Sequence, residues 1–292
     1  MNPTLKAALW MTGAIASFSS MAVAGRELGD RYDTFEIMLY RSIVGVLIVA
    51  MVLSVTGKWH QVSRRSLGTH AIRNVAHFTG QNLWFFAVTM IPLAQVFALE
   101  FTTPLWVIIL SPLLLGEKLT PVRILAVVFG FAGVLIVARP GAVEIGPGVM
   151  AAASCAIFFA LTAIVTKRLT RTESIGSIMF WLTSMQAVLG AIAVGLDGDI
   201  FLPTLAALPW LVLVGLAGLL AHFCITSALA IAPATVVIPF DFVRLPAISV
   251  IGMLLYNEMP DIWVFVGAIL IVAAIYLNVL SETRKNRIAR AS

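Results

Sequence analysis

Long apolar runs recur along the whole of this chain, separated by short polar gaps. A run of about 20 residues, wound as an α-helix, crosses the roughly 30 Å of hydrocarbon in a bilayer. Backbone groups in lipid must be paired within the segment, which favours helices, and the alternation typical of barrel strands is absent. We predict transmembrane helices over residues 6–25, 34–56, 71–89, 93–115, 120–138, 147–167, 174–196, 205–230, 235–256 and 261–280. The predicted fold class is an all-α integral membrane protein with ten transmembrane helices.

The composition also indicates a bilayer rather than water as the solvent. Of the 292 residues, 60% are hydrophobic and 11% are charged, whereas about 25% of the residues in a soluble domain are charged. The net charge of +5 suggests nucleic acid at first sight. The basic residues, however, lie in short gaps between apolar runs, a distribution that sets membrane orientation. We therefore expect a lipid bilayer, and no nucleic acid, as a partner.

The first run has two interpretations. Lys6, the apolar stretch after it and Ala22-Val23-Ala24 resemble a cleavable secretory signal. The alternative is a first transmembrane helix from Lys6 to Gly25. We favour the helix, because removing it would break the internal repeat described below.

The distribution of lysine and arginine predicts the orientation. With a cytoplasmic N-terminus, fourteen of the 19 basic residues fall in inner segments and three fall in outer loops. The inner set includes the basic segment from Gly57 to Arg73, and Arg41 and Arg244 fall inside spans. Because cytoplasmic loops are rich in lysine and arginine, we predict a multi-pass protein of a bacterial-type inner membrane with both termini cytoplasmic.

The two halves of the chain match at an offset of 141 residues. The offset aligns Ile91-Pro92 with Ala232-Pro233, Glu100 with Asp241, Glu117 with Glu258, and Arg26 with Lys167. With five spans in each half, an odd number, the second half enters the membrane upside down, as in many secondary transporters. We place the first repeat at residues 1–140 and the second, with its basic cytoplasmic tail, at residues 141–292.

One segment of each half resembles a known family. The segment from Pro92 to Gly133 is similar to the EamA repeat of the drug/metabolite transporter superfamily. It contains Glu100, Pro104-Leu105-Trp106, Leu114-Leu115-Gly116-Glu117-Lys118-Leu119-Thr120 and Gly130-Phe131-Ala132-Gly133. Phe35-Glu36 with Arg41 also resembles that family, and Pro233 to Leu277 matches more loosely.

The resemblance implies ten helices, cytoplasmic termini and a central cavity lined by the third, fourth, eighth and ninth helices. The second copy departs from the pattern with Tyr256-Asn257-Glu258 and with Asp241 and Arg244. This departure leaves the substrate open. Carriers of riboflavin and of S-adenosylmethionine belong to the same broad superfamily.

Charged residues inside the spans are the first candidates for a site, because each costs about 2.5–3.5 kcal/mol to insert. Arg41 and Glu100 lie at similar depths below the outer boundary and are expected to be able to pair. A fixed structural ion pair, a pair broken by a proton or substrate, and no contact remain alternatives. Asp241 and Arg244 are three residues apart and share a helix face. They either bind substrate and protons or neutralise each other between helices.

Three further residues complete the candidate substrate- and proton-binding set. His77 and His222 lie in the third and eighth spans, where a helix–helix hydrogen bond and a proton relay are the alternatives. Trp84 is a candidate for stacking on a flat substrate, with packing as the alternative. Prolines within the fourth and ninth spans predict kinks beside the acids: Pro104, Pro112, Pro239 and Pro246. No metal site is expected, because the two histidines and two cysteines have no recognisable ligand spacing.

These features favour a secondary active transporter that moves a small organic metabolite by alternating access. Amino-acid export and uptake of a vitamin or nucleoside-like solute are both open, and the arginines favour an anionic or zwitterionic substrate. A channel or a non-transporting assembly subunit is the alternative. The sequence shows no ATPase motif and no nucleophile–base set, so no enzyme activity and no cofactor are expected. We expect a monomer or a homodimer.

Overall fold

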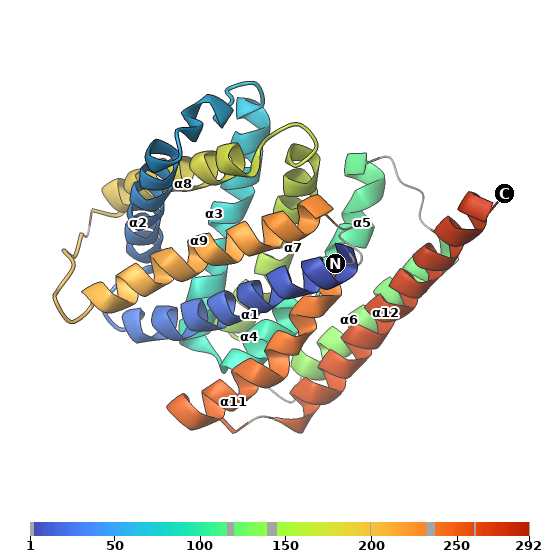
Figure 1. The fold of residues 1–292 in the computed structure, drawn as a ribbon. Helices are drawn as coiled ribbons and strands as arrows, with labels where there is room; N and C mark the ends of the chain where they lie inside the picture. The colour runs from blue at the N-terminus through green and yellow to red at the C-terminus, as the bar shows by residue number, and fades with distance from the viewer. Residues whose placement is uncertain are drawn as a thin grey trace.

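The computed structural model describes residues 3–115, 120–138, 145–198, 200–231, 237–259 and 261–291, and these residues form helices joined by short loops (Figure 1). Two elements, η1 and η2, are 3-10 helices and the others are α-helices. The elements are α1 (Pro3–Leu28), α2 (Thr34–Val55), η1 (Lys58–Gln61), α3 (Leu67–Met90), α4 (Leu93–Glu100), α5 (Thr103–Leu115), α6 (Pro121–Ala138), α7 (Pro147–Leu169), α8 (Ile175–Asp197), α9 (Leu208–Ile231), η2 (Ile238–Val243), α11 (Arg244–Tyr256) and α12 (Ile262–Ala291).

The length and composition of these helices define a multi-pass membrane protein. Within the described residues, six segments are long and apolar enough to span a bilayer: Leu5–Leu28, Thr34–Val55, Leu93–Leu110, Pro147–Leu169, Ile175–Leu196 and Leu208–Ile231. Shorter apolar helices cover Ile124–Val137, Arg244–Tyr256 and Ile262–Ala274. Large apolar side chains are exposed on the outside of the bundle, as at Leu47 and Leu196. Such a surface is suited to lipid rather than to water.

The internal repeat of the sequence is also a repeat of the structure. Three helices of the first half start at the same position as their counterparts when 141 is added to the residue numbers, and two of them also end at the same position. The pairs start at Thr34 and Ile175, at Leu67 and Leu208, and at Thr103 and Arg244. The connections that precede α2 and α8, from Leu28 to Thr34 and from Leu169 to Ile175, also match in length.

Hydrogen bonds at the ends of α2 and α8 show that these equivalent helices run in opposite directions. Near the start of α2, Glu36 Oε1 accepts from the backbone N–H of Phe201, which follows α8, at 2.5 Å. At the other end, Ser174 Oγ, which caps the start of α8, donates to the carbonyl of Gln61, beyond the end of α2, at 3.2 Å. Equivalent helices that are antiparallel mean that the two halves are inverted with respect to each other, as the odd number of predicted spans requires.

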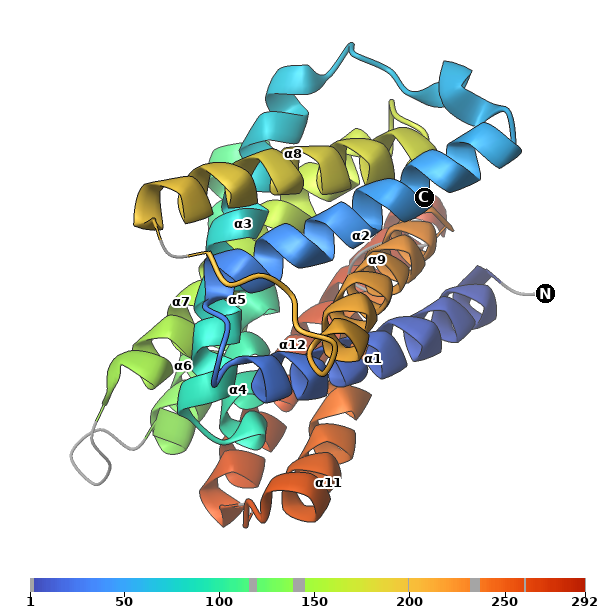
Figure 2. The same ribbon diagram turned by 90° about the vertical axis from the view of Figure 1, so that its left-hand side faces the viewer.

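The packing of the helices has the same symmetry (Figures 1 and 2). Helix α1 packs against α9, and the equivalent pair is α7 against α3. Helices α2 and α8 pack against each other, as do α6 and α12, so each of these helices contacts its own counterpart, and α4 packs against α11 across the halves. Between α6 and α12, a Cβ on Gly133 would lie 2.7 Å from the carbonyl oxygen of Gly267, so the absence of a side chain at Gly133 allows these helices to pack closely.

Both proline-containing spans are discontinuous. The fourth span ends as α4 at Glu100 and resumes as α5 at Thr103, so that Pro104 lies in the first turn of α5. The ninth span is the 3-10 helix η2 up to Val243 and then the α-helix α11, with Pro246 in its first turn. Proline lacks the N–H of a helix interior but is tolerated in a first turn. The kinks predicted beside Glu100 and Asp241 are thus breaks at equivalent positions.

The first run and the basic loop, two segments outside the site, can be compared with the sequence predictions. The first run is a helix, α1, packed against α9, as the transmembrane interpretation predicts. The basic loop is shorter than predicted, because α3 starts at Leu67 and includes Arg73. Glu117 and the pair Ala232-Pro233 lie outside the described residues.

Glu258, just after the end of α11, contacts α1 and α4. Its carboxylate forms an ion pair with Arg26 at the end of α1 and accepts from the backbone N–H of Leu93 at 2.8 Å. Arg26 Nη2 also donates to the carbonyl of Ile91 at 2.6 Å. These contacts join the ends of α1 and α11 to the start of α4, because the carboxylate satisfies a free N–H at that helix start.

Candidate functional site

A cavity of about 130 Å³ lies in the interior between the two halves. It is lined by residues from both repeats: Met11, Phe18, Arg73, His77, Gln81, Glu100, Phe101, Thr103, Pro104, Phe159, Thr162, Ala163, Thr166, His222, Ile225, Thr226, Leu229, Asp241 and Arg244. The third, fourth, eighth and ninth spans all contribute, as the family resemblance implies, and so do the first and sixth spans through α1 and α7.

Several lining residues form pairs at equivalent positions of the two repeats. The offset of 141 relates Phe18 to Phe159, Gln81 to His222, Glu100 to Asp241, and Thr103 to Arg244. A cavity lined by equivalent residues of both halves lies where the halves meet. In an inverted repeat, this is the place that each side of the membrane can reach in turn.

Arg244 joins the acidic residues of the two halves. Its Nη2 donates to Glu100 Oε1 at 2.7 Å and to Asp241 Oδ2 at 2.6 Å. Arg244 is 1% exposed, so little water is present to screen these ion pairs. The equivalent breaks in the two spans place both carboxylates within reach of one guanidinium, and the cluster has a formal charge of −1.

Aromatic rings surround the same guanidinium. The Arg244 carbon Cζ lies 4.6 Å from the centre of the Phe97 ring and 4.9 Å from that of Phe18. The Phe101 ring centre is 5.7 Å away. Arginine stacks on aromatic faces more readily than lysine, and such contacts are worth about 2 kcal/mol or more when desolvated. The rings and the two carboxylates together fix the orientation of the guanidinium.

Trp84 holds Glu100 rather than lining the cavity. Its indole Nε1 donates to Glu100 Oε2 at 2.7 Å, and the side chain is buried against Phe85 and Phe97. The packing alternative therefore describes this residue better than stacking on a substrate does. The second oxygen of Glu100 is satisfied in this way, which leaves the first for Arg244.

The possible pair between Arg41 and Glu100 is not formed, because Glu100 is paired with Arg244. Arg41 lies against Gly218 of α9, where a Cβ would come within 2.4 Å of its Nε, and Arg41 Nη1 donates to Met38 Sδ at 3.3 Å. It lines a separate small cavity between α2, α8 and α9. Similar depth in the membrane did not bring the charges together, since α2 and α4 face different neighbours.

His77 and His222 meet across the cavity. Their ring centres are 4.6 Å apart and the rings are nearly perpendicular, at 87°. Among the described residues, both ring nitrogens of His77 and Nε2 of His222 are buried without a hydrogen-bond partner. The two rings form one aromatic contact, and the unpartnered nitrogens are available to a bound molecule.

Arg73 is a cavity residue that the sequence reasoning missed. It was counted with the basic inner loop, but its side chain is buried in α3 and lines the cavity. A signal was present, because Arg73, His77 and Gln81 follow one another at intervals of four residues and so share one helix face.

Cys155 and Cys224 are free and buried, as small hydrophobic side chains would be. Cys155 Sγ donates to the carbonyl of Ala152 at 3.1 Å. The cavity thus offers paired charges, a further cation, imidazoles, hydroxyls and three phenyl rings. These groups bind and orient a molecule.

A cavity lined by buried charged residues, between two inverted helical repeats of a multi-pass membrane protein, is typical of membrane transporters. The EamA-like transporter family matches residues 5–139 and again residues 146–280 of this chain. The chain therefore belongs to this family, with two EamA domains, and is a transporter of a small molecule rather than an enzyme.

Curated relatives agree with this assignment over nearly their whole length. An S-adenosylmethionine uptake transporter of Rickettsia bellii is 26% identical, and the match covers 94% of each chain. A riboflavin transporter of Brucella anthropi is 30% identical, covering 91% of this chain and 96% of the relative. A riboflavin transporter of Vibrio cholerae is 27% identical, covering 97% and 96%.

A crystal structure of another protein has the same fold. Its sequence is 19% identical, the TM-score is 0.68, and the match covers 95% of this chain and 98% of the other. At this level of identity the comparison shows the fold alone.

Proposed function

We propose that this protein is a secondary active transporter that takes up a small organic metabolite across a bacterial-type inner membrane by alternating access. The observation that carries the proposal is the Glu100–Arg244–Asp241 cluster, in which one guanidinium binds the equivalent carboxylates of the two repeats. A carrier that rocks one half against the other must make and break contacts between the halves at its binding site. Contacts to these groups couple substrate binding to that movement.

The cavity suits a substrate with a flat ring. Phe18 and Phe159, at equivalent positions in α1 and α7, both line it, and phenyl rings stack on planar ring systems. Riboflavin and S-adenosylmethionine, the compounds named for the relatives, each contain such a ring system. We therefore favour uptake of a vitamin or nucleoside-like solute over export of an amino acid.

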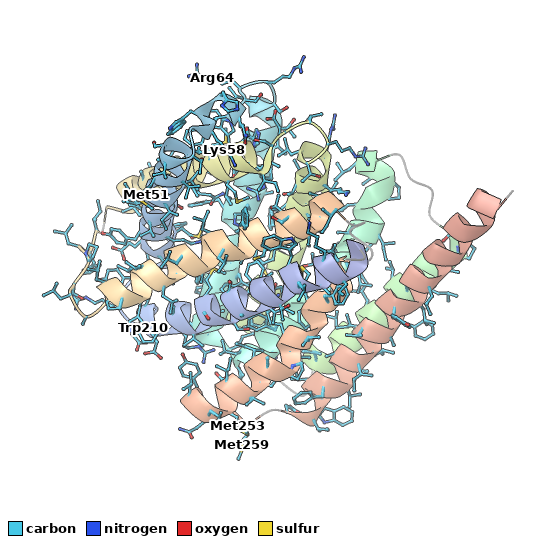
Figure 3. The ribbon with its side chains drawn as sticks, viewed as in Figure 1. Met51, Lys58, Arg64, Trp210, Met253 and Met259 are labelled. Carbon is cyan, nitrogen blue, oxygen red and sulfur yellow. The ribbon has the colours of Figure 1, made fainter. Side chains whose placement is uncertain are left out.

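The distribution of charge supports cytoplasmic termini. Figure 3 shows Lys58 and Arg64 on the opposite side of the molecule from Met253 and Met259. Basic residues concentrate on the cytoplasmic side of membrane proteins, which assigns the first side to the cytoplasm. In the same proposal, the first repeat ends at residue 140 and the second begins at residue 141. The protein acts as a monomer or a homodimer.

Counterflow in proteoliposomes tests the transport mechanism. Vesicles loaded with unlabelled riboflavin or S-adenosylmethionine are diluted into the same labelled compound, and a carrier then accumulates label transiently. A channel, or a subunit without transport activity, would show no stimulation by substrate on the opposite side. Vesicles containing Arg244→Ala protein serve as the control. Stimulation by neither compound would contradict the proposed substrates, and leakage that follows the gradient alone would contradict a carrier.

A further inference from the structure

Arg73 is a buried cation without a carboxylate partner among the described residues. The residue is 1% exposed. Its Nε donates to Thr166 Oγ1 at 3.0 Å and its Nη1 to Asn74 Oδ1 at 3.4 Å, and both acceptors are neutral. Among the described residues no acidic side chain lies within ion-pair distance of it. Arg244, in the same cavity, has two such partners.

An uncompensated charge in this setting requires a reason. Burial removes a guanidinium from water, and neutral hydrogen-bond partners return only part of the lost solvation. Charged side chains within a membrane usually face a partner or a functional cavity. Arg73 faces the cavity, and its missing partner is therefore expected to come from a bound molecule.

The surroundings of Arg73 are suited to an anion. His77 and Gln81 follow it on the same face of α3, and His222 and Thr226 approach from α9. The Gln81 amide Nε2, His222 Nε2 and Thr226 Oγ1 are buried without partners among the described residues. All of these groups can donate hydrogen bonds, and none carries negative charge. A planar carboxylate matches the guanidinium and these donors.

The charge of the cavity is also divided between two regions. The Glu100–Arg244–Asp241 cluster has a formal charge of −1 and Arg73 has a charge of +1. The repeat does not impose this division, because the position equivalent to Arg73 is Val214 and the position equivalent to His77 is Gly218. Within the described residues, the cavity's cation without a carboxylate partner comes from the first half.

We propose that Arg73 binds the carboxylate of a zwitterionic substrate, whose cationic group faces Glu100 and Asp241. This inference rests on the proposed transport function and narrows its substrate class. Of the two compounds considered above, S-adenosylmethionine carries a carboxylate and cationic groups. Riboflavin carries neither at neutral pH.

Binding to matched ligands tests the role of Arg73. Titration calorimetry on the protein in nanodiscs, at a mildly acidic pH where the amine of the ester is also protonated, compares S-adenosylmethionine with its carboxyl methyl ester, which then keeps the ring and both cations. The wild-type protein is expected to bind the acid at least tenfold more tightly than the ester. Arg73→Gln should bind both equally, and Arg73→Lys, which keeps the charge without the planar fork, should retain part of the preference.

Arg41→Gln is the control variant. It removes another buried guanidinium, for which the described part of the chain likewise offers no carboxylate partner, but one outside the central cavity. Arg41→Gln should therefore keep the preference of the wild-type protein. A preference for the acid that persists in Arg73→Gln would overturn the proposal. Equal binding of acid and ester by the wild-type protein, or binding of riboflavin alone, would overturn it as well.

The two proposals fail in different ways. Counterflow of riboflavin without counterflow of S-adenosylmethionine would leave the carrier mechanism in place and refute the role of Arg73. Selective binding of the acid without counterflow would support the anion site and refute transport by exchange. Thermal unfolding of Arg73→Gln and Arg73→Lys establishes that both variants are folded before binding is measured.

Discussion

Two kinds of buried charge stand in the same cavity. Arg244 is bound by Glu100 and Asp241 and enclosed by aromatic rings, whereas Arg73 has only neutral partners among the described residues. The first arrangement stabilises the contact between the repeats. The second leaves a cation unsatisfied, at a cost to the folded protein. The comparison shows that burial alone does not distinguish a structural charge from a functional one. The charges of the residues that contact it do.

The largest effect is expected at Arg244. Arg244→Ala leaves two carboxylates buried together without a cation, which costs about 3–5 kcal/mol of stability. We expect a clear fall in the Tm of the purified protein and loss of substrate counterflow. Arg244→Lys is the control, because it keeps the charge and should recover part of the Tm. Wild-type counterflow by Arg244→Ala would remove the cluster from the transport mechanism.

A smaller effect is expected at Glu100. In Glu100→Gln the amide oxygen can still accept from Trp84, and Arg244 keeps Asp241, so the loss is about 1–3 kcal/mol. Counterflow should fall at least tenfold. Asp241→Asn provides the matched comparison. Asp241 Oδ1 has no partner among the described residues, so fewer contacts are lost there than at Glu100. A larger fall in Tm for Asp241→Asn than for Glu100→Gln would contradict this ranking.

Trp84→Phe tests whether the indole N–H of Trp84 holds the Glu100 carboxylate in place. The phenyl ring keeps most of the packing but loses the N–H that binds Glu100 Oε2, a loss of about 0.5–1.5 kcal/mol. Counterflow should fall by less than tenfold. Phe86→Leu, at a side chain on the same helix that is 38% exposed, should change neither the Tm nor the flux. Equal effects of the two substitutions would show that the indole hydrogen bond contributes nothing.

The smallest effect on stability is expected at Arg73, and it has the opposite sign. Arg73→Gln removes an uncompensated buried charge, so the Tm should stay the same or rise, while carboxylate binding is lost. Differential scanning fluorimetry without ligand measures the first quantity. A fall in Tm as large as that of Arg244→Ala would mean that Arg73 is part of the structural framework, which would erase the contrast between the two arginines.

Most of the fold could be predicted from the sequence, because bilayer thickness sets helix length and the repeat sets the order of the helices. The prolines placed both breaks beside Glu100 and Asp241. The ion pair between Asp241 and Arg244 followed from their spacing of three residues, a local relation that needs no tertiary information.

The partners of residues distant in the chain could not be predicted in the same way. Depth in the membrane suggested that Arg41 pairs with Glu100, but depth leaves the rotation of each helix undetermined. Arg73 was assigned to a loop because its charge suggested water, although α3 buries it. Trp84 was considered as a ligand contact, since its indole N–H bond to Glu100 depends on how α3 packs against α4.

The matching helix starts of the two halves have an energetic consequence. If each half adopts the conformation of the other, the helices pack in the same way as before, but the cavity opens to the opposite side of the membrane. The two end states of such a cycle then differ in free energy only through positions where the repeats carry different side chains, such as Arg73 and Val214 or Thr103 and Arg244. Because about 1.4 kcal/mol corresponds to a tenfold change in population, a substitution at such a position that shifts the balance by this amount would change tenfold the ratio of the two states of the empty transporter.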